Sequence, residues 1–163
     1  MRAWLRQVDD AGGTKGRGAP EDGGTRGGYV EARTATSGVI PYLTVEGAAE
    51  ASLFYQRALG AQELERMAAE HSVRLLHCHL VVNGGSLMLC DNFPEYGAGT
   101  VQRTDADVMQ LIVGDGDAWW SRALEAGCTV RLPFKRAPWG DRYGQFVDPF
   151  GVIWALLEPA NDA

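Results

Sequence analysis

The sequence lacks the features of a membrane or secreted protein. No stretch of its 163 residues approaches the roughly 18 consecutive apolar residues that span a bilayer, and residues 1–6 lack the apolar core of a secretory signal. It has only three cysteines, Cys78, Cys90 and Cys128, which is an odd number. All three lie inside apolar runs of the sequence. These features favour reduced, buried thiols and predict a cytoplasmic protein with no membrane partner.

Basic residues are also in deficit. The chain has 15 lysines and arginines against 21 aspartates and glutamates, which gives a net charge of −6. This balance repels a phosphate backbone, so nucleic-acid binding is not expected. No glycine-rich loop follows a strand and opens a helix, and no Ser-His-Asp order with a strained turn is visible. The sequence therefore predicts neither a phosphate-cradling loop nor a serine hydrolase.

Glycine is concentrated at the start of the chain. Residues 1–37 hold eight of the 21 glycines, together with six basic and five acidic residues. Such a segment buries too little apolar surface to offset its ordering entropy, so we expect a flexible glycine-rich leader. A basic docking arm is the alternative, which the nearly equal number of acids disfavours. The folded domain is expected at 38–159, followed by a tail at 160–163.

The domain contains one pattern twice. In the first copy a β-branched run at 39–45 precedes a helical pattern at 47–59, which Gly60 is placed to end in a left-handed cap. In the second copy a strand-like run at 108–113 precedes a helical pattern that begins at Asp115, a suitable N-cap. The two copies therefore predict the same supersecondary unit.

The spacing of landmarks supports a duplication. Val45 and Val113 are 68 residues apart, and Gly85 and Gly151 are 66 apart. After each helix there is room for two strands before a final apolar strand. These strands are expected at 62–69, 72–82 and 87–90 in the first copy, and at 129–136, 143–147 and 153–157 in the second. A repeat of this length indicates two β-α-β-β-β modules, not a solenoid.

The two modules are expected at 38–91 and 107–159, joined by a linker at 92–106. The segment WGDRYGQFVDPFG, from Trp139 to Gly151, resembles the signature of the glyoxalase/bleomycin-resistance/dioxygenase (vicinal oxygen chelate) superfamily, and especially its PhnB-like branch. The first strand and helix of the domain and the strand around His77 resemble the same branch. This resemblance covers about residues 38–159.

The resemblance implies an α+β fold in which two βαβββ modules form an eight-stranded, incompletely closed barrel around a cavity. It also implies a homodimer. Members of the superfamily include metal-dependent lyases, isomerases, ring-cleaving dioxygenases and thiol transferases, as well as metal-free drug-binding proteins. The fold alone therefore does not indicate which of these functions the protein has, and the function has to be inferred from the residues of the site.

Metal-dependent members place one ligand on the first and one on the last strand of each module, and these ligands are His, Gln or Glu. Counting from the family's opening and from the repeat offsets gives four positions in this chain, Ile40, Leu89, Val108 and Ala155. None of these side chains binds a divalent metal. We therefore expect no metal site and no cofactor.

Two histidines offer an alternative. His77 and His79 are two residues apart in a predicted strand, so both project to one face and could coordinate one ion. A third ligand is needed, and His71, Glu63 and Glu158 are candidates that no spacing selects. The two histidines could also contact an organic ligand, or be polar residues of a half-exposed strand.

Strand alternation suggests which other side chains face the cavity. Tyr42 and Thr44 are expected to point inward from the first strand, and Gln110 from the equivalent strand of the second module. These polar groups among apolar neighbours suit an organic ligand more than a charged one. The same residues could instead fill the interior as core.

Three further candidates lie at the expected mouth of the barrel, namely Trp139, Arg142 and Tyr143. Arg142 could hold a carboxylate or phosphate of a ligand with two hydrogen bonds. It could equally pair with Asp141 or Asp148.

The first hypothesis is a metal-free member that binds or sequesters a small organic molecule. Its predicted ligand-binding residues are Tyr42, Thr44, His77, His79, Gln110, Trp139, Arg142 and Tyr143, with no catalytic residue. The second is a lyase or isomerase that uses His77 and His79, with or without a relocated metal. The third is a dimerisation module whose cavity is filled.

Overall fold

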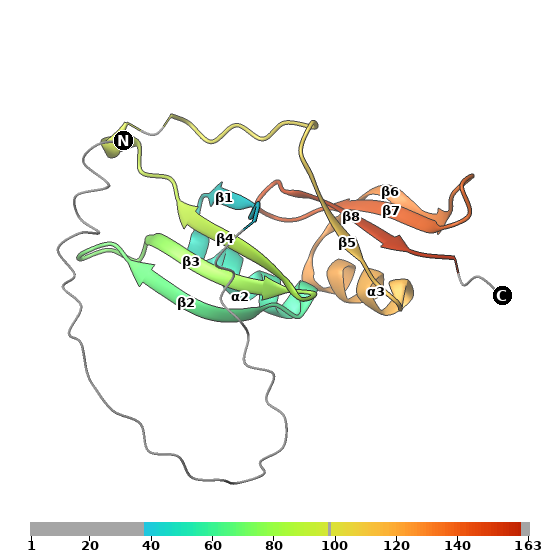
Figure 1. The fold of residues 1–163 in the computed structure, drawn as a ribbon. Coiled ribbons are helices and arrows are strands. Elements are labelled where there is room, and N and C mark those ends of the chain that lie inside the picture. Colours follow the sequence, from blue (N-terminus) through green and yellow to red (C-terminus); the bar gives the residue numbers. More distant parts are fainter. Residues whose placement is uncertain (1–37, 98, 161–163) are drawn as a thin grey trace, which may run out of the picture.

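The computed structural model describes residues 38–97 and 99–160 (Figure 1). The predicted leader at 1–37 and residues 161–163 lie outside them. The first module consists of β1 (Tyr42–Val45), α2 (Ala48–Leu59), β2 (Gln62–Ala68), β3 (Leu75–Val82) and β4 (Gly85–Asp91). After a short 3-10 helix, η1 (Pro94–Tyr96), the second module consists of β5 (Val108–Ile112), α3 (Gly116–Ala126), β6 (Thr129–Arg136), β7 (Arg142–Val147) and β8 (Ile153–Glu158).

Each module builds its own four-stranded sheet. The strand order is β1-β4-β3-β2 in the first sheet and β5-β8-β7-β6 in the second. The first strand of each module pairs in parallel with the last, and the other neighbours are antiparallel. The predicted α+β fold of two βαβββ modules is confirmed, and the eight strands of the described residues do not close into a complete barrel.

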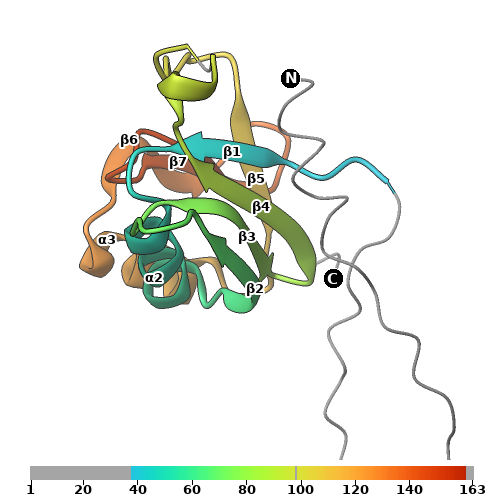
Figure 2. The same ribbon diagram turned by 90° about the vertical axis from the view of Figure 1, so that its left-hand side faces the viewer.

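Each sheet packs one face against the helices. Figure 2 shows α2 and α3 together on one side of the molecule. Leu43 and Val45 of β1 belong to the buried core, as does Leu111 of β5. Successive side chains of a strand point to opposite faces, so Tyr42 and Thr44 point away from the helices. We call the face of each sheet opposite its helix the open face.

The parallel pairing corrects one of the four positions derived from the repeat. Gln110 pairs with Ala155 in the second sheet, and the equivalent pair in the first is Tyr42 with Met88. Leu89 instead points into the core, where it is fully buried. The offset of 66 was one residue too short because Gly85 and Gly151 are not equivalent. Gly85 is the first residue of β4, whereas Gly151 lies in the turn before β8.

Two carboxylates, the buried Asp91 and the exposed Asp115, fix the ends of these elements. Asp91, at the end of β4, accepts hydrogen bonds from the backbone N–H groups of Gly47 and Ala48, at 2.8 and 3.0 Å, and so caps α2. Its other oxygen accepts from the Leu75 N–H at 2.6 Å. Asp115 caps α3 as predicted, since its side chain accepts from the backbone N–H of Ala118. Asp91 therefore holds the helix, β3 and β4 of the first module together.

The two modules meet through their helices and an aromatic cluster. Arg122 of α3 donates from Nε to the carbonyl oxygen of Ala58 at the end of α2, at 3.1 Å. The ring centroids of Tyr55 and Trp154 are 5.5 Å apart, in an edge-on arrangement. This cluster joins α2 to β8, so the relative position of the two sheets is set on the helix side.

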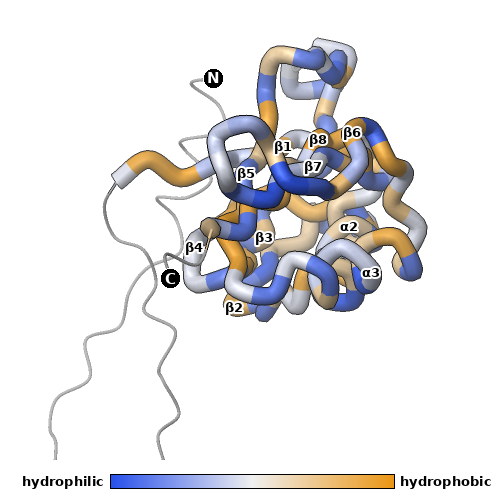
Figure 3. Tube along the Cα trace, turned by 90° about the vertical axis from the view of Figure 1, so that its right-hand side faces the viewer, coloured by the Kyte–Doolittle hydropathy of each residue, from blue (hydrophilic) through white to orange (hydrophobic). Residues whose placement is uncertain are grey.

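Hydrophobic segments of the chain are short and alternate with hydrophilic ones (Figure 3). Within residues 38–97 and 99–160, no helix has the length and apolar content needed to cross a bilayer.

Candidate functional site

Tyr42 and His77 form a polar pair on the open face of the first sheet. The Tyr42 hydroxyl lies 2.9 Å from Nδ1 of His77, although β4 separates their two strands. Both side chains project from the same face, as strand alternation requires. Burial and the nearby Cys90 raise the pKa of Tyr42 to about 12. The phenol therefore keeps its proton at neutral pH and acts as a hydrogen-bond donor.

Thr44 extends this polar surface along β1. Its Oγ1 lies 3.8 Å from Sγ of Cys90 on the paired strand β4. Burial raises the pKa of the Cys90 thiol above its usual value, although hydrogen bonds from Thr44 and Tyr42 act in the opposite direction. Cys90 is therefore a neutral thiol, not a reactive thiolate, at neutral pH.

His79 lies on the same strand face as His77 but does not share a partner with it. Its side chain is almost fully buried, and Nε2 lies 3.0 Å from Oγ of Ser86. Across residues 38–97 and 99–160, no three side chains among His, Cys, Asp and Glu are grouped closely enough to hold a metal ion. The alternative of a metal site on these two histidines therefore gains no third ligand from the described part of the chain.

A cavity of about 500 Å³ lies where β1, the linker and the turn before β8 meet. Tyr42 and Thr44 form part of its wall, as do Met109 of β5 and Ile153 of β8. Among the described residues, the lining is Pro41, Tyr42, Leu43, Thr44, Asn92, Gly99, Thr100, Val101, Gln102, Arg103, Thr104, Asp107, Met109, Gly151, Val152 and Ile153. The volume is within the usual range for a site that binds a small organic molecule.

Of the residues that line this cavity, the sequence singled out only Tyr42 and Thr44, and it missed the charged residue Arg103. It comes from the linker and donates a hydrogen bond from its guanidinium to the carbonyl oxygen of Thr44. Its side-chain stem lies over Gly151, where a Cβ would be only 3.2 Å from Arg103 Cγ. Arg103 therefore touches both modules. The linker shows no periodicity, so no sequence signal could have identified this contact.

The predicted residues of the second module lie apart from this cavity. Gln110 is exposed on β5, and its register with Ala155 places it on the open face of the second sheet. Trp139 and Tyr143 are 5.8 Å apart between ring centroids and line a separate hollow of about 240 Å³ at the β6–β7 hairpin. The structure thus separates the predicted residues into a group around β1, a group at the β6–β7 hairpin, and Gln110 on β5.

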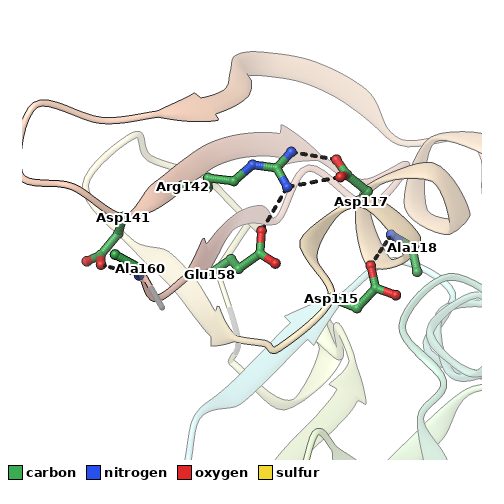
Figure 4. A network of polar contacts seen from close by, with 7 residues as sticks. All are labelled: Asp115, Asp117, Ala118, Asp141, Arg142, Glu158 and Ala160. Carbon is green, nitrogen blue, oxygen red and sulfur yellow. Dashed lines mark hydrogen bonds and ion pairs between the residues drawn. The ribbon is translucent and has the colours of Figure 1, made fainter. Parts of the chain in front are cut away.

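Arg142 points to the helix side, opposite Tyr143. Its guanidinium bonds to both carboxylate oxygens of Asp117, at 2.5 and 2.9 Å, and to Glu158 at 2.9 Å (Figure 4). It also lies 4.4 Å above the centroid of the Phe134 ring. The Asp117 carboxylate raises the pKa of Arg142 further above its usual value. These contacts occupy the Arg142 guanidinium, which is therefore not available to bind a ligand.

The carboxylates expected beside Arg142 have other partners. Asp141 accepts a hydrogen bond from the backbone N–H of Ala160 at 2.9 Å (Figure 4). Asp148 is buried and accepts from the Tyr55 hydroxyl at 2.8 Å and from the Trp154 indole at 2.9 Å. The expected pairing with Asp141 or Asp148 was therefore wrong. Asp117 was missed because it is distant in sequence and lies on α3.

Comparison with family models decides the classification. Residues 34–156 match the model described as "Glyoxalase/Bleomycin resistance protein/Dioxygenase superfamily". The chain belongs to this superfamily. The resemblance read from the motif at 139–151 is confirmed. Among relatives, "Uncharacterized protein Rv0887c" of Mycobacterium tuberculosis is 39% identical over 127 residues, which cover 75% of this chain and 74% of that protein.

Solved structures support the glyoxalase/bleomycin-resistance fold. Protein PA1353 from Pseudomonas aeruginosa is 27% identical, with a TM-score of 0.62 over 77% of this chain and 100% of that chain. The PhnB protein from Bacillus cereus, titled a putative 3-demethylubiquinone-9 3-methyltransferase, has 20% identity and a TM-score of 0.63, with 76% and 100% covered. TioX from Micromonospora sp. ML1 has 23% identity and a TM-score of 0.61, with 75% and 98% covered. At this identity, the last two show the fold alone.

Proposed function

We propose that this superfamily member binds a small organic molecule in the cavity between β1 and the linker, without a bound divalent metal. The observation that carries the proposal is a cavity of about 500 Å³ whose wall is more polar than apolar but offers both kinds of surface. Val101, Met109 and Ile153 supply apolar surface, and Tyr42 and Thr44 supply hydroxyls. Apolar surface beside a few placed polar groups is what holds and orients a small organic ligand in its site.

The side chains at the family's metal positions support the metal-free part of the proposal. After the register correction, these positions carry Ile40, Met88, Val108 and Ala155. The first, third and fourth are hydrocarbons, and a thioether is a poor ligand for hard or borderline divalent ions. These four side chains therefore do not fit the divalent metal of the metal-dependent members, and the proposed function does not involve a metal ion.

Binding would proceed by enclosure and orientation. The apolar wall takes the hydrocarbon part of the ligand out of water, at about 25 cal/mol per Å² of apolar surface. Tyr42 remains protonated because burial raises its pKa to about 12, so its hydroxyl donates to a ligand acceptor or to His77. The Tyr42–His77 pair would thus orient the polar end of the ligand.

A lyase or isomerase without a metal is the second candidate function. The observation in its favour is the 2.9 Å contact between the Tyr42 hydroxyl and His77 Nδ1, which joins a phenol and an imidazole, two groups that serve in acid–base catalysis. Turnover abolished in both Tyr42→Phe and His77→Gln, with binding retained, would favour catalysis. A domain with a filled cavity is the weakest of the three hypotheses, because the cavity is open.

We also propose that the protein is a cytoplasmic homodimer. The open faces leave large apolar side chains exposed, among them Ile112 at 58% and Tyr42 at 44%. A second copy would cover this surface. The three cysteines are free thiols, which favours a reducing compartment.

Two measurements test the proposed function. Protein purified without chelators should contain no stoichiometric transition metal by mass spectrometry, and a stoichiometric ion that is lost in the H77A/H79A double variant would overturn the metal-free proposal. Fluorescence titration with the neutral probe N-phenyl-1-naphthylamine should show saturable binding. Gln102→Trp, which places a bulky ring in the cavity from the exposed linker, should weaken that binding. Binding that Gln102→Trp leaves unchanged would contradict the proposed cavity.

A further inference from the structure

Charge is scarce in the proposed cavity. Among the described residues that line it, only Arg103 and Asp107 carry a formal charge at neutral pH. Both come from the segment between the modules, which runs along the upper side of the molecule near β1 in Figure 1. The ligand would therefore meet one cationic and one anionic group, and their partners determine which of them is available.

Arg103 is held in place without being neutralised. One N–H of its guanidinium donates to the Thr44 carbonyl oxygen, and its stem lies over Gly151. Within residues 38–97 and 99–160 it has no carboxylate within 4.0 Å, unlike Arg66, Arg74, Arg131 and Arg142, which all form ion pairs. A guanidinium has five N–H donors in a planar fork, so one bond to a carbonyl leaves donors for a ligand.

These observations assign a ligand class. We propose that Arg103 binds the oxyanion of a small organic monoanion whose apolar part lies against Val101, Met109 and Ile153. This rests on the proposed function, because it concerns the same cavity. Arg142, the arginine that the sequence suggested for this role, is occupied by Asp117 and Glu158, whereas Arg103 is the only cation among the described lining residues.

The charge of the lining limits the ligand to one negative group. Arg103 and Asp107 cancel, so a bound monoanion leaves the site with a net charge of −1. A dianion would add a second negative charge without a second cation to receive it. A planar guanidinium is well suited to an oxyanion because it can donate two parallel hydrogen bonds to it. Carboxylates, sulfonates and monoesters of phosphonates each carry one negative charge on oxygen atoms that can accept these hydrogen bonds.

Two fluorescent probes that differ in one group provide the test. The dye 8-anilinonaphthalene-1-sulfonate carries one sulfonate, and N-phenyl-1-naphthylamine is the same skeleton without it. Arg103→Gln should weaken binding of the sulfonate by about tenfold, as expected for the loss of one charge-assisted contact in a partly open site, and leave the neutral probe within about twofold. Arg57→Gln, on the exposed side of α2, should change neither.

The outcomes separate the two proposals. Equal affinity of the sulfonate for wild type and Arg103→Gln overturns the role of Arg103, while saturable binding of the neutral probe still supports the proposed function. Equal weakening of both probes by Arg103→Gln also overturns it, because the effect is then loss of cavity shape. If neither probe binds the wild type, or if Gln102→Trp weakens neither, both proposals fail. Thermal unfolding of each variant confirms that it is folded.

Discussion

The hydroxyl of Tyr55 on α2 donates a 2.8 Å hydrogen bond to Oδ2 of Asp148, in the turn between β7 and β8. The same oxygen accepts from the Trp154 indole, and Oδ1 accepts from the backbone N–H groups of Phe150 and Val152. Tyr55 and Asp148 are both buried. This carboxylate thus connects a helix of the first module to the last turn of the second, which also supplies Gly151, Val152 and Ile153 to the cavity.

Tyr55→Phe should lower the free energy of unfolding by about 2 kcal/mol, because it removes a buried hydrogen bond to a charged group. Urea unfolding followed by tryptophan fluorescence measures the change. Tyr96→Phe is the matched control, since Tyr96 is 64% exposed and its hydroxyl lies in water. An equal effect of the two substitutions would show that the contact between Tyr55 and Asp148 does not join the modules.

Much of this fold could be predicted because periodicity is a local property. Alternation placed Leu43 and Val45 on the helix side of β1, and the N-cap at Asp115 followed from its position before an apolar helical pattern. The prediction that Leu89 is equivalent to Ala155 was wrong, because strand register depends on the length of each turn. The two glycines used to align the modules do not occupy equivalent places in their turns. A shift of one residue reverses the face of a strand.

The site was less predictable because it depends on contacts between distant segments. Tyr42 and His77 were both predicted to contact a ligand, and the structure brings them together across β4. Arg103 lies in a linker without any pattern, and its position follows from a bond to Thr44, 59 residues away. The ion-pair partners of Arg142 could not be predicted from the sequence either, because Asp117 lies on a helix whose position against β7 the sequence does not determine.

The reactivity of the three cysteines should be low and pH-dependent. Burial raises the pKa of Cys78 to about 11 and that of Cys128 to about 12, and it also raises the pKa of Cys90. At pH 7.5 the thiolate fraction is therefore small, and Cys78 and Cys128 are also inaccessible. Titration with a thiol-reactive disulfide reagent should show one slow site, lost in Cys90→Ser, and three sites in urea. Rapid reaction of two or more thiols in the folded protein would contradict this.

Stability should depend on Glu63 in acid. A salt bridge and hydrogen bonds from Arg66, together with the Ser52 hydroxyl, lower the pKa of Glu63 below its usual value of 4.5. A carboxyl whose pKa is lower in the folded state stabilises the protein above its unfolded pKa, and this stability is lost as pH falls through the folded pKa. Glu63→Gln should therefore destabilise the protein at pH 6 and have a smaller effect at pH 3.5.

Urea unfolding at the two pH values measures this difference. Glu65→Gln is the control, because Glu65 lies on the same strand and forms no ion pair among the described residues. A Glu63→Gln effect that is the same at pH 6 and pH 3.5 would show that the ion pair contributes nothing, and that any loss comes from the changed bond to Ser52.

The proposed homodimer can be tested with two lysine substitutions. Ile112 is 58% exposed on the open face of the second sheet, and Val73 is 85% exposed in the loop between β2 and β3. If a second copy covers the open face, Ile112→Lys buries a charge in the interface and should convert a dimer into a monomer, because an unpaired buried charge costs several kcal/mol. Val73→Lys adds the same charge away from that face and should leave the dimer intact. Light scattering after size-exclusion chromatography at micromolar concentration measures both masses, and a monomeric wild type, or a dimer that survives Ile112→Lys, would contradict the proposal.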